Sequence, residues 1–288
     1  MSVMAGLIIV EGLPGSGKST TAQGLSTWLS GQGVSAEHYP EGRHDNPVDF
    51  EQVAVLTNDD LVRFLGELPS SADDLIRAAE RSGDVWLVRH GRHPEWPRSL
   101  RSRLAEHDSY DGSVSPELHM RVLTESWRQY GQRSAPAHVE VLECVLVQNP
   151  VTALLARFDQ PVEVVESHIR GLARAAAPRR PALVYLDAGD PRATLEQAAA
   201  ERSPEWLESV IGYHTQQGYG LAYGLEGFDG YVEFMRHRRS IELEIVSSLD
   251  LPTLVVSVDE RPWHVRDSEI QAFVGDHLGI DDRAVSGW

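Results

Sequence analysis

The sequence contains one lysine, Lys18, and one cysteine, Cys144, in 288 residues. A single cysteine excludes an intramolecular disulfide and a metal site built from four cysteines, and it fits a reducing compartment. Lys18 accounts for one of the 26 basic residues, so the other 25 are arginines. Any chemistry that needs a lysine side chain must therefore use Lys18.

Long apolar runs are also absent. No segment approaches the roughly 18 consecutive apolar residues of a membrane helix, and Met1-Ser2-Val3-Met4 lacks the basic start of a secretion signal. The sequence thus predicts no membrane span and a cytoplasmic protein. Its 43 acidic residues outweigh the 26 basic ones, and the net charge of −17 repels nucleic acids. We expect a small-molecule partner, and the sequence leaves a homodimer open.

The most specific motif is the P-loop Gly12-Leu13-Pro14-Gly15-Ser16-Gly17-Lys18-Ser19, which Thr20 follows. It lies between an apolar run typical of a buried strand, 7–10, and a predicted helix, 20–29. Its glycines let backbone N–H groups turn toward phosphate oxygens, and the helix N-terminus adds its positive dipole end. Lys18 would reach the β- and γ-phosphates, and Ser19 would ligate Mg²⁺. The motif predicts a site for a nucleoside triphosphate with Mg²⁺.

The scarcity of lysine also bears on the base of the nucleotide. The commonest guanine-recognition loop has the pattern Asn-Lys-x-Asp, and no lysine other than Lys18 is present to form it. ATP is therefore the expected nucleotide.

Strands and helices alternate along almost the whole chain. This alternation predicts one three-layer α/β domain over residues 1–280, a P-loop NTPase fold with a five-stranded parallel sheet. We expect a helical substrate-side insertion at 43–137, a lid and following helix region at 200–226, and a loose tail at 281–288. The expected strands are 7–10, 34–39, 139–146, 183–186 and 252–258. The expected helices include 59–68, 71–82, 116–131, 162–176, 204–217, 228–249 and 267–278. Two more are expected to start at Asn149-Pro150 and Asp190-Pro191, with Asn149 and Asp190 as the N-caps.

Two glutamates are expected at the carboxyl ends of strands, where ligands of open α/β sheets bind. Glu41 lies in the turn Pro40-Glu41-Gly42 after strand 34–39, and it is a candidate general base toward an acceptor hydroxyl. Glu143 has apolar neighbours in strand 139–146, so its burial would require a cation or a donor, and we expect it to support Mg²⁺. The alternatives are an exposed turn glutamate at 41 and, at 143, a glutamate that faces outward or pairs with an arginine.

Phosphate charge beyond that neutralised by Lys18 must be met by arginine, metal or backbone groups. Arg202 follows a predicted helix and precedes Ser203-Pro204, which suits a loop that closes on the γ-phosphate; an arginine that offsets the helix dipole is the alternative. The cluster Arg89-His90-Gly91-Arg92-His93 could bind an acceptor phosphate or other polar groups. A surface loop without a ligand is the simpler interpretation of that cluster.

The order of these features resembles the deoxynucleoside kinase and thymidylate kinase group of P-loop phosphotransferases. Gly12 to Ser19 matches their phosphate loop, and Tyr39-Pro40-Glu41-Gly42 looks like the strand ending that carries their base. Leu142-Glu143-Cys144 resembles their Glu-Arg-Ser ending, with Cys144 in place of arginine. Leu183–Asp187, followed by Ala200-Glu201-Arg202, resembles their strand, helix and arginine-bearing lid.

We therefore expect an ATP-dependent kinase that phosphorylates a nucleoside, a nucleotide or another small polar acceptor. Its catalytic residues would be Lys18, Glu41 and Arg202, with Mg²⁺ held at Ser19 and Glu143. The nucleotide would be bound by Gly12, Leu13, Pro14, Gly15, Ser16, Gly17, Lys18, Ser19 and Thr20. The alternative is a nucleotide-dependent regulatory or binding protein that hydrolyses ATP slowly.

Overall fold

The computed structural model describes residues 6–134, 138–258 and 262–280. The chain divides into two compact units, one formed by Met1–Glu41 with Gly131–Trp288 and the other by Gly42–Tyr130. The expected tail at 281–288 lies outside the described residues. The segment that we expected to be an insertion in a single domain thus forms a compact unit of its own.

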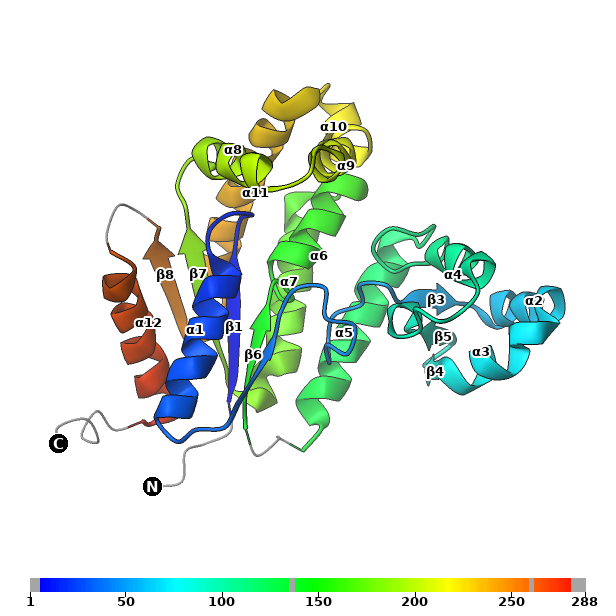
Figure 1. The fold of residues 1–288 in the computed structure, drawn as a ribbon, viewed down its shortest axis with the longest axis horizontal. Helices are drawn as coiled ribbons and strands as arrows, with labels where there is room; N and C mark the ends of the chain where they lie inside the picture. The colour runs from blue at the N-terminus through cyan, green and yellow to red at the C-terminus, as the bar shows by residue number, and fades with distance from the viewer. Residues whose placement is uncertain (1–5, 135–137, 259–261, 281–288) are drawn as a thin grey trace. The chain divides into compact units, whose positions relative to one another are not determined.

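The first unit contains a five-stranded parallel sheet (Figure 1), as the sequence predicts. Its strand order is β2-β6-β1-β7-β8, which puts the strand before the P-loop in the centre. Central β1 is buried along its whole length, which explains why its sequence is an apolar run. The strands are β1 (Leu7–Gly12), β2 (Ala36–Tyr39), β6 (Val139–Glu143), β7 (Pro181–Asp187) and β8 (Thr253–Ser257).

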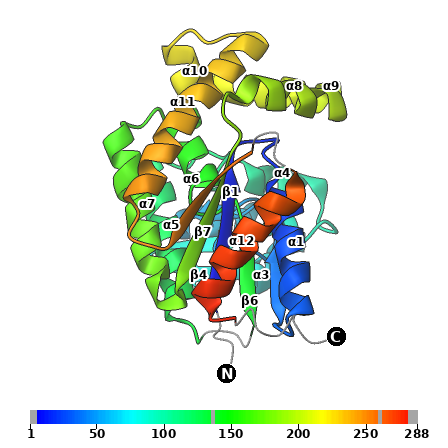
Figure 2. The same cartoon turned by 90° about the vertical axis from the view of Figure 1, so that its left-hand side faces the viewer.

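Helices cover both faces of this sheet (Figure 2). On one face α1 (Lys18–Gly31) and α12 (Trp263–Leu278) enclose an apolar core in which Val10 of β1 meets Leu25 and Val274. On the other face lie α7 (Val162–Ala176) and α11 (Gly227–Ser248). Among the described residues, no helix is long and apolar enough to cross a membrane. The remaining helical segments of this unit are α6 (Gln148–Thr152), η3 (Ala153–Arg157), η4 (Ala177–Arg179), α8 (Pro191–Glu201), α9 (Pro204–Thr215) and α10 (Gly218–Ala222).

The chain turns earlier after β6 than its apolar sequence predicts. The strand ends at Glu143 because Cys144 adopts a left-handed backbone conformation, with φ of 67°, which few non-glycine residues tolerate. Helix α6 then begins at Gln148, so the predicted start with Asn149 as cap was wrong. Pro150 still fits, because N–H groups in the first turn of a helix have no intrahelical partner.

The second unit combines helices with a three-stranded antiparallel sheet that the sequence pattern does not predict. The sheet order is β3-β5-β4, and its apolar side packs with Phe64 and Leu100 in a separate core. The expected helix 71–82 was too long, because its last residues form β4. The elements are β3 (Ala54–Leu56), α2 (Asn58–Glu67), η1 (Pro69–Ser71), α3 (Ala72–Ala78), β4 (Ala79–Ser82), β5 (Val85–Val88), η2 (His90–Arg92), α4 (Arg98–Ala105) and α5 (Pro116–Gln132).

A buried ion pair joins α11 to the sheet of the first unit. Nε of Arg238 donates to Glu242 Oε1 at 2.7 Å, and both side chains are almost completely buried. The hydroxyl of Tyr185 in β7 donates to the other oxygen of Glu242 at 2.7 Å. Nη1 of Arg238 donates to Thr152 Oγ1 in α6 at 2.8 Å. This pair therefore links α11, β7 and α6 through hydrogen bonds, of which the two to Glu242 are buried and the one to Thr152 is partly buried.

Replacement of Arg238 by methionine should strongly destabilise the fold. Loss of one partner from a buried ion pair leaves an uncompensated charge, which costs roughly 3 to 5 kcal/mol. Urea unfolding would measure this loss. The double variant Arg238→Met/Glu242→Gln should recover part of the stability, because it removes the remaining charge and keeps an acceptor for Tyr185. A single variant as stable as the wild type would contradict the assigned role.

Candidate functional site

The P-loop connects β1 to α1 in the first unit. Gly17 is the N-cap of α1, and Lys18 is the first residue of the helix. The Lys18 side chain is 7% exposed, and its Nζ donates to the Leu13 carbonyl at 3.0 Å. Within the loop, the Ser16 hydroxyl is buried and has no hydrogen-bond partner among the described residues. The loop thus presents a buried ammonium and an unused hydroxyl beside a helix N-terminus, a combination that suits anionic oxygens.

Three glycines let the loop adopt this form. Gly12, Gly15 and Gly17 all have positive φ, at 142°, 81° and 92°, where side chains are strained. A Cβ on Gly12 would lie 2.5 Å from the Leu186 carbonyl oxygen, and one on Gly17 would lie 2.6 Å from the ring of Trp263. The loop therefore packs tightly between β7 and the start of α12. The chain has the P-loop fold.

A carboxylate on the adjacent strand reaches the P-loop helix. The Ser19 hydroxyl donates to Glu143 Oε2 at 2.7 Å, and Glu143 is fully buried at the end of β6. The other oxygen of Glu143 lies 2.5 Å from Nε2 of His38 in β2. The structure thus brings together the two residues that the sequence assigns to Mg²⁺. It adds His38, which sequence reasoning missed because nothing in the motif points to its partner.

These residues fit a magnesium ion that arrives with a nucleotide. Mg²⁺ is usually bound through one or two protein oxygens together with phosphate oxygens and water. A hydroxyl that hydrogen-bonds a buried carboxylate supplies such oxygens, and the buried Ser16 hydroxyl leaves a further acceptor in the loop. Ser19 and Glu143 are therefore the residues that would hold this ion.

Glu11, the last residue before the loop glycine, holds the segment that follows β6. Its carboxylate accepts backbone N–H groups of Leu146, Val147 and Gln148 at 2.8, 3.0 and 2.9 Å, and its side chain is fully buried. These donors surround the N-terminus of α6, so the carboxylate also complements the dipole of that helix. Sequence reasoning missed Glu11 because its donors lie more than 130 residues away along the chain.

Gln148 extends this arrangement to the candidate base. Its side-chain Nε2 donates to Glu41 Oε1 at 2.7 Å, and Glu41 is exposed in the turn after β2. The Gln148 side chain is buried, and its Oε1 has no hydrogen-bond partner among the described residues. Glu41 therefore lies at the carboxyl edge of the sheet, as expected, and is oriented by a residue to which the sequence assigns no role. The free amide oxygen beside it could accept a hydrogen bond from a bound molecule.

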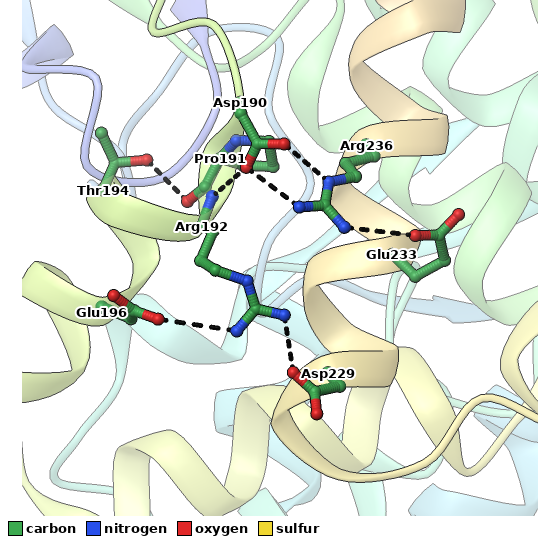
Figure 3. Close-up of polar contacts among 8 residues, drawn as sticks. All are labelled: Asp190, Pro191, Arg192, Thr194, Glu196, Asp229, Glu233 and Arg236. Atoms are coloured by element: carbon green, nitrogen blue, oxygen red, sulfur yellow. Dashed lines mark hydrogen bonds and ion pairs between the residues drawn. The ribbon is translucent and has the colours of Figure 1, made fainter.

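Helix α8 packs against the P-loop and is anchored at its start. A Cβ on Gly15 would lie 3.0 Å from the Thr194 carbonyl oxygen of α8. Figure 3 shows Asp190 accepting the N–H of Arg192 at 2.9 Å, as the N-cap that the sequence predicts, and receiving Nε of Arg236 at 2.8 Å. Nη2 of Arg192 donates to Asp229 at 2.6 Å. The first turn of α8 is thus tied to α11.

Arg202 lies at the other end of α8. It is the C-cap residue, is exposed, and stacks over the ring of Trp206 at 5.4 Å. Among the described residues it makes no hydrogen bond or ion pair to the P-loop. The expected contact of Arg202 with a phosphate would therefore require closure of the region that follows α8, and it stays a prediction.

The cluster at 89–93 is mostly occupied with structural contacts in the second unit. Nη1 of Arg89 reaches the carbonyl oxygens of Asn46 and Asp49 at 3.5 and 3.4 Å, and Nε of Arg92 donates to the His44 carbonyl at 3.0 Å. His93 lies 3.0 Å from Glu95. Of this cluster, His90 and Gly91 line a cavity.

No family model matches the chain, and no curated protein matches it. Among solved structures, the chain is similar to thymidylate kinase from Candida albicans, with 12% identity and a TM-score of 0.45. The match covers 96% of this chain and 93% of that one.

Burial changes the acidity of Glu11. Removal from water raises the pKa of its carboxyl from 4.5 to about 7, although the backbone donors of Gln148, Val147 and Leu146 favour the ionised form. Between these two values the folded chain retains a proton that the unfolded chain loses. The free energy of unfolding therefore falls as pH rises through this window, and the stabilisation is complete only below pH 4.5.

The variant Glu11→Gln should lack this dependence on pH. Between pH 5 and pH 8, the stability of the wild type relative to Glu11→Gln should fall by about 2 to 3 kcal/mol. Urea unfolding of both proteins at several pH values gives this difference and cancels the titration of other groups. A difference that stays constant over the range would show that Glu11 ionises normally.

Proposed function

We propose that this protein is an ATP-dependent kinase that transfers the γ-phosphoryl group to a small polar acceptor. The observation that carries the proposal is the hydrogen bond from Ser19 to buried Glu143, beside Lys18 and at the same sheet edge as Glu41. At this edge Ser19 and Glu143, next to Lys18, suit a triphosphate with its metal ion. Glu41 offers a base for an acceptor. Nucleosides, nucleotides and unrelated small hydroxyl compounds are the candidate acceptors.

The donor half of the site would act by positioning and by charge neutralisation, which dominate phosphoryl transfer. Backbone N–H groups of the loop and Lys18 would bind the β- and γ-phosphates. Ser19 and Glu143 would hold Mg²⁺, which supplies neutralising charge to the phosphate oxygens when it is bound. Closure of the region after α8 would bring Arg202 to the transferring group.

The acceptor half would depend on Glu41. A carboxylate within hydrogen-bond reach of an acceptor hydroxyl can orient it and accept its proton. Gln148 would fix Glu41 through the 2.7 Å hydrogen bond, while its own Oε1 is available to a hydroxyl or amine of the acceptor. Glu11 directly precedes the P-loop and accepts the backbone N–H of Gln148, so it connects the donor half of the site to the acceptor half.

Lys18→Met should abolish phosphoryl transfer and leave the fold intact. A screen of nucleosides, nucleotides and other metabolites with ATP and Mg²⁺ identifies the acceptor by the mass of one added phosphoryl group. Loss of the only ammonium in the loop should then lower kcat/KM by at least about a hundredfold. Circular dichroism and thermal unfolding verify the fold. Unchanged transfer by Lys18→Met would refute the mechanism.

Glu41→Gln distinguishes a kinase from a regulatory ATPase. In a kinase, loss of the base should lower transfer to the acceptor by about 10² to 10⁴, while hydrolysis of ATP without acceptor changes much less. Glu163→Gln, the same change at an exposed position of α7, is the matched control and should leave transfer unchanged. Gln148→Leu should lower kcat in the same direction as Glu41→Gln. If the screen yields no phosphorylated acceptor and Glu41→Gln leaves ATP hydrolysis unchanged, the regulatory ATPase is favoured.

A further inference from the structure

The second unit contains a cavity, lined mainly by polar residues, that the proposed kinase mechanism does not use. Its volume is about 470 Å³, within the range of pockets that bind small molecules. One wall is a single face of α4, and η2 and the segments next to it contribute further lining residues. A Cβ on Gly91 would lie 2.7 Å from Nδ1 of His44 and 2.9 Å from Oε1 of Gln52. These side chains therefore lie closely around the turn at Gly91.

The face of α4 brings two arginines to this cavity. Arg98 and Arg101 lie one turn apart and both line it. Neither forms an ion pair within the part of the chain that the structure describes; Arg101 is oriented by one hydrogen bond from its Nε to the Trp96 carbonyl at 3.2 Å. Six other arginines of the unit are paired with acids: Arg43 with Asp45, Arg63 with Asp60, Arg77 with Asp74, Arg103 with Glu67, Arg121 with Asp84 and Arg128 with Glu125. Arg81, Arg89 and Arg92 donate to backbone carbonyls.

One of the two acids that line the cavity, Asp108, is occupied by contacts of its own. Asp108 is buried; its Oδ1 accepts the N–H groups of Tyr110 and Asp111 at 2.9 and 3.2 Å, and its Oδ2 lies 3.2 Å from Nε2 of His90. The buried His90 ring is thereby fixed in orientation at the cavity wall. Asp108 therefore forms no ion pair with Arg98 or Arg101. The acid that Arg101 influences is Glu95, whose pKa is lowered by its own backbone N–H, by His93 and more weakly by Arg101.

We propose that this cavity is a second ligand site, which binds a small molecule through an oxyanion, a phosphate or carboxylate group, held by Arg98 and Arg101. Guanidinium groups match the geometry of both anions and bind them through charge-assisted hydrogen bonds. His44, Gln52 and His90 supply polar groups for the rest of the ligand. The site lies within the second unit and does not depend on the P-loop.

Calorimetric titration at low salt tests this site, with inorganic phosphate and citrate as probes. The experiment uses the full chain with Lys18→Met, so that the phosphate loop contributes little and failure of the kinase proposal leaves the result interpretable. Arg98→Gln/Arg101→Gln should raise the Kd by about tenfold or more. The control Arg77→Gln/Arg121→Gln removes the same charge from two exposed ion pairs of the same unit and should change the Kd less than about twofold.

Each outcome bears on the site. Binding of phosphate alone, of citrate alone or of both, lost in the Arg98/Arg101 variant and kept in the control, supports the proposal and identifies the anion. Equal loss in both double variants shows attraction by net charge alone and overturns it, as does absence of binding. If the double variant unfolds, Arg98→Gln alone takes its place in the titration. Arg98 is exposed, so this single change should leave the fold intact.

Discussion

The carboxylate of Glu11 accepts three backbone N–H groups of the segment between β6 and α6. Two of the other candidate groups, Gln148 and Glu41, depend on this interaction for their position. It sets the segment that carries Gln148, which in turn contacts Glu41, and it ties that segment to the strand that ends in the P-loop. The left-handed conformation of Cys144 makes the turn sharp enough for these N–H groups to surround the carboxylate. The tight connection between β6 and α6 therefore costs folding free energy in two ways, through the strained backbone of Cys144 and through burial of the Glu11 carboxylate.

The parallel sheet was predictable because its signal is local. A buried strand such as β1 is recognised by its run of apolar residues. The start of α8 is indicated by Asp190, whose side chain caps the helix, and by the proline that follows it. The end of β6 was not predictable, since the sequence Cys144-Val145-Leu146 is as apolar as the strand before it. At this point the course of the backbone is set by hydrogen bonds to a residue far away in the sequence, such as those from Leu146 and Val147 to Glu11. The same holds for β3 and β4, whose short sequences become strands only by pairing with β5.

The residues of the candidate site also fall into two groups, those that the sequence identifies and those that only the structure identifies. The P-loop is identified by a contiguous motif, and Glu143 and Glu41 by their place at strand ends, so the amino-acid sequence is enough to select these residues. His38 and Gln148 contact them across the sheet edge from other parts of the chain. No spacing in the sequence encodes such contacts. Arg98 and Arg101 were missed for a further reason: an arginine without an acid partner is recognised only when all its neighbours are known.

Lys18 is the only side-chain amine in this protein. A reagent that acylates primary amines therefore has one side-chain target, and that target lies inside the phosphate loop, 7% exposed and hydrogen-bonded to Leu13. The extent of acylation, read from the mass of the peptide that contains Lys18, reports directly on access to the loop. The unaltered chain thus carries its own chemical probe of loop occupancy, and no engineered label is required.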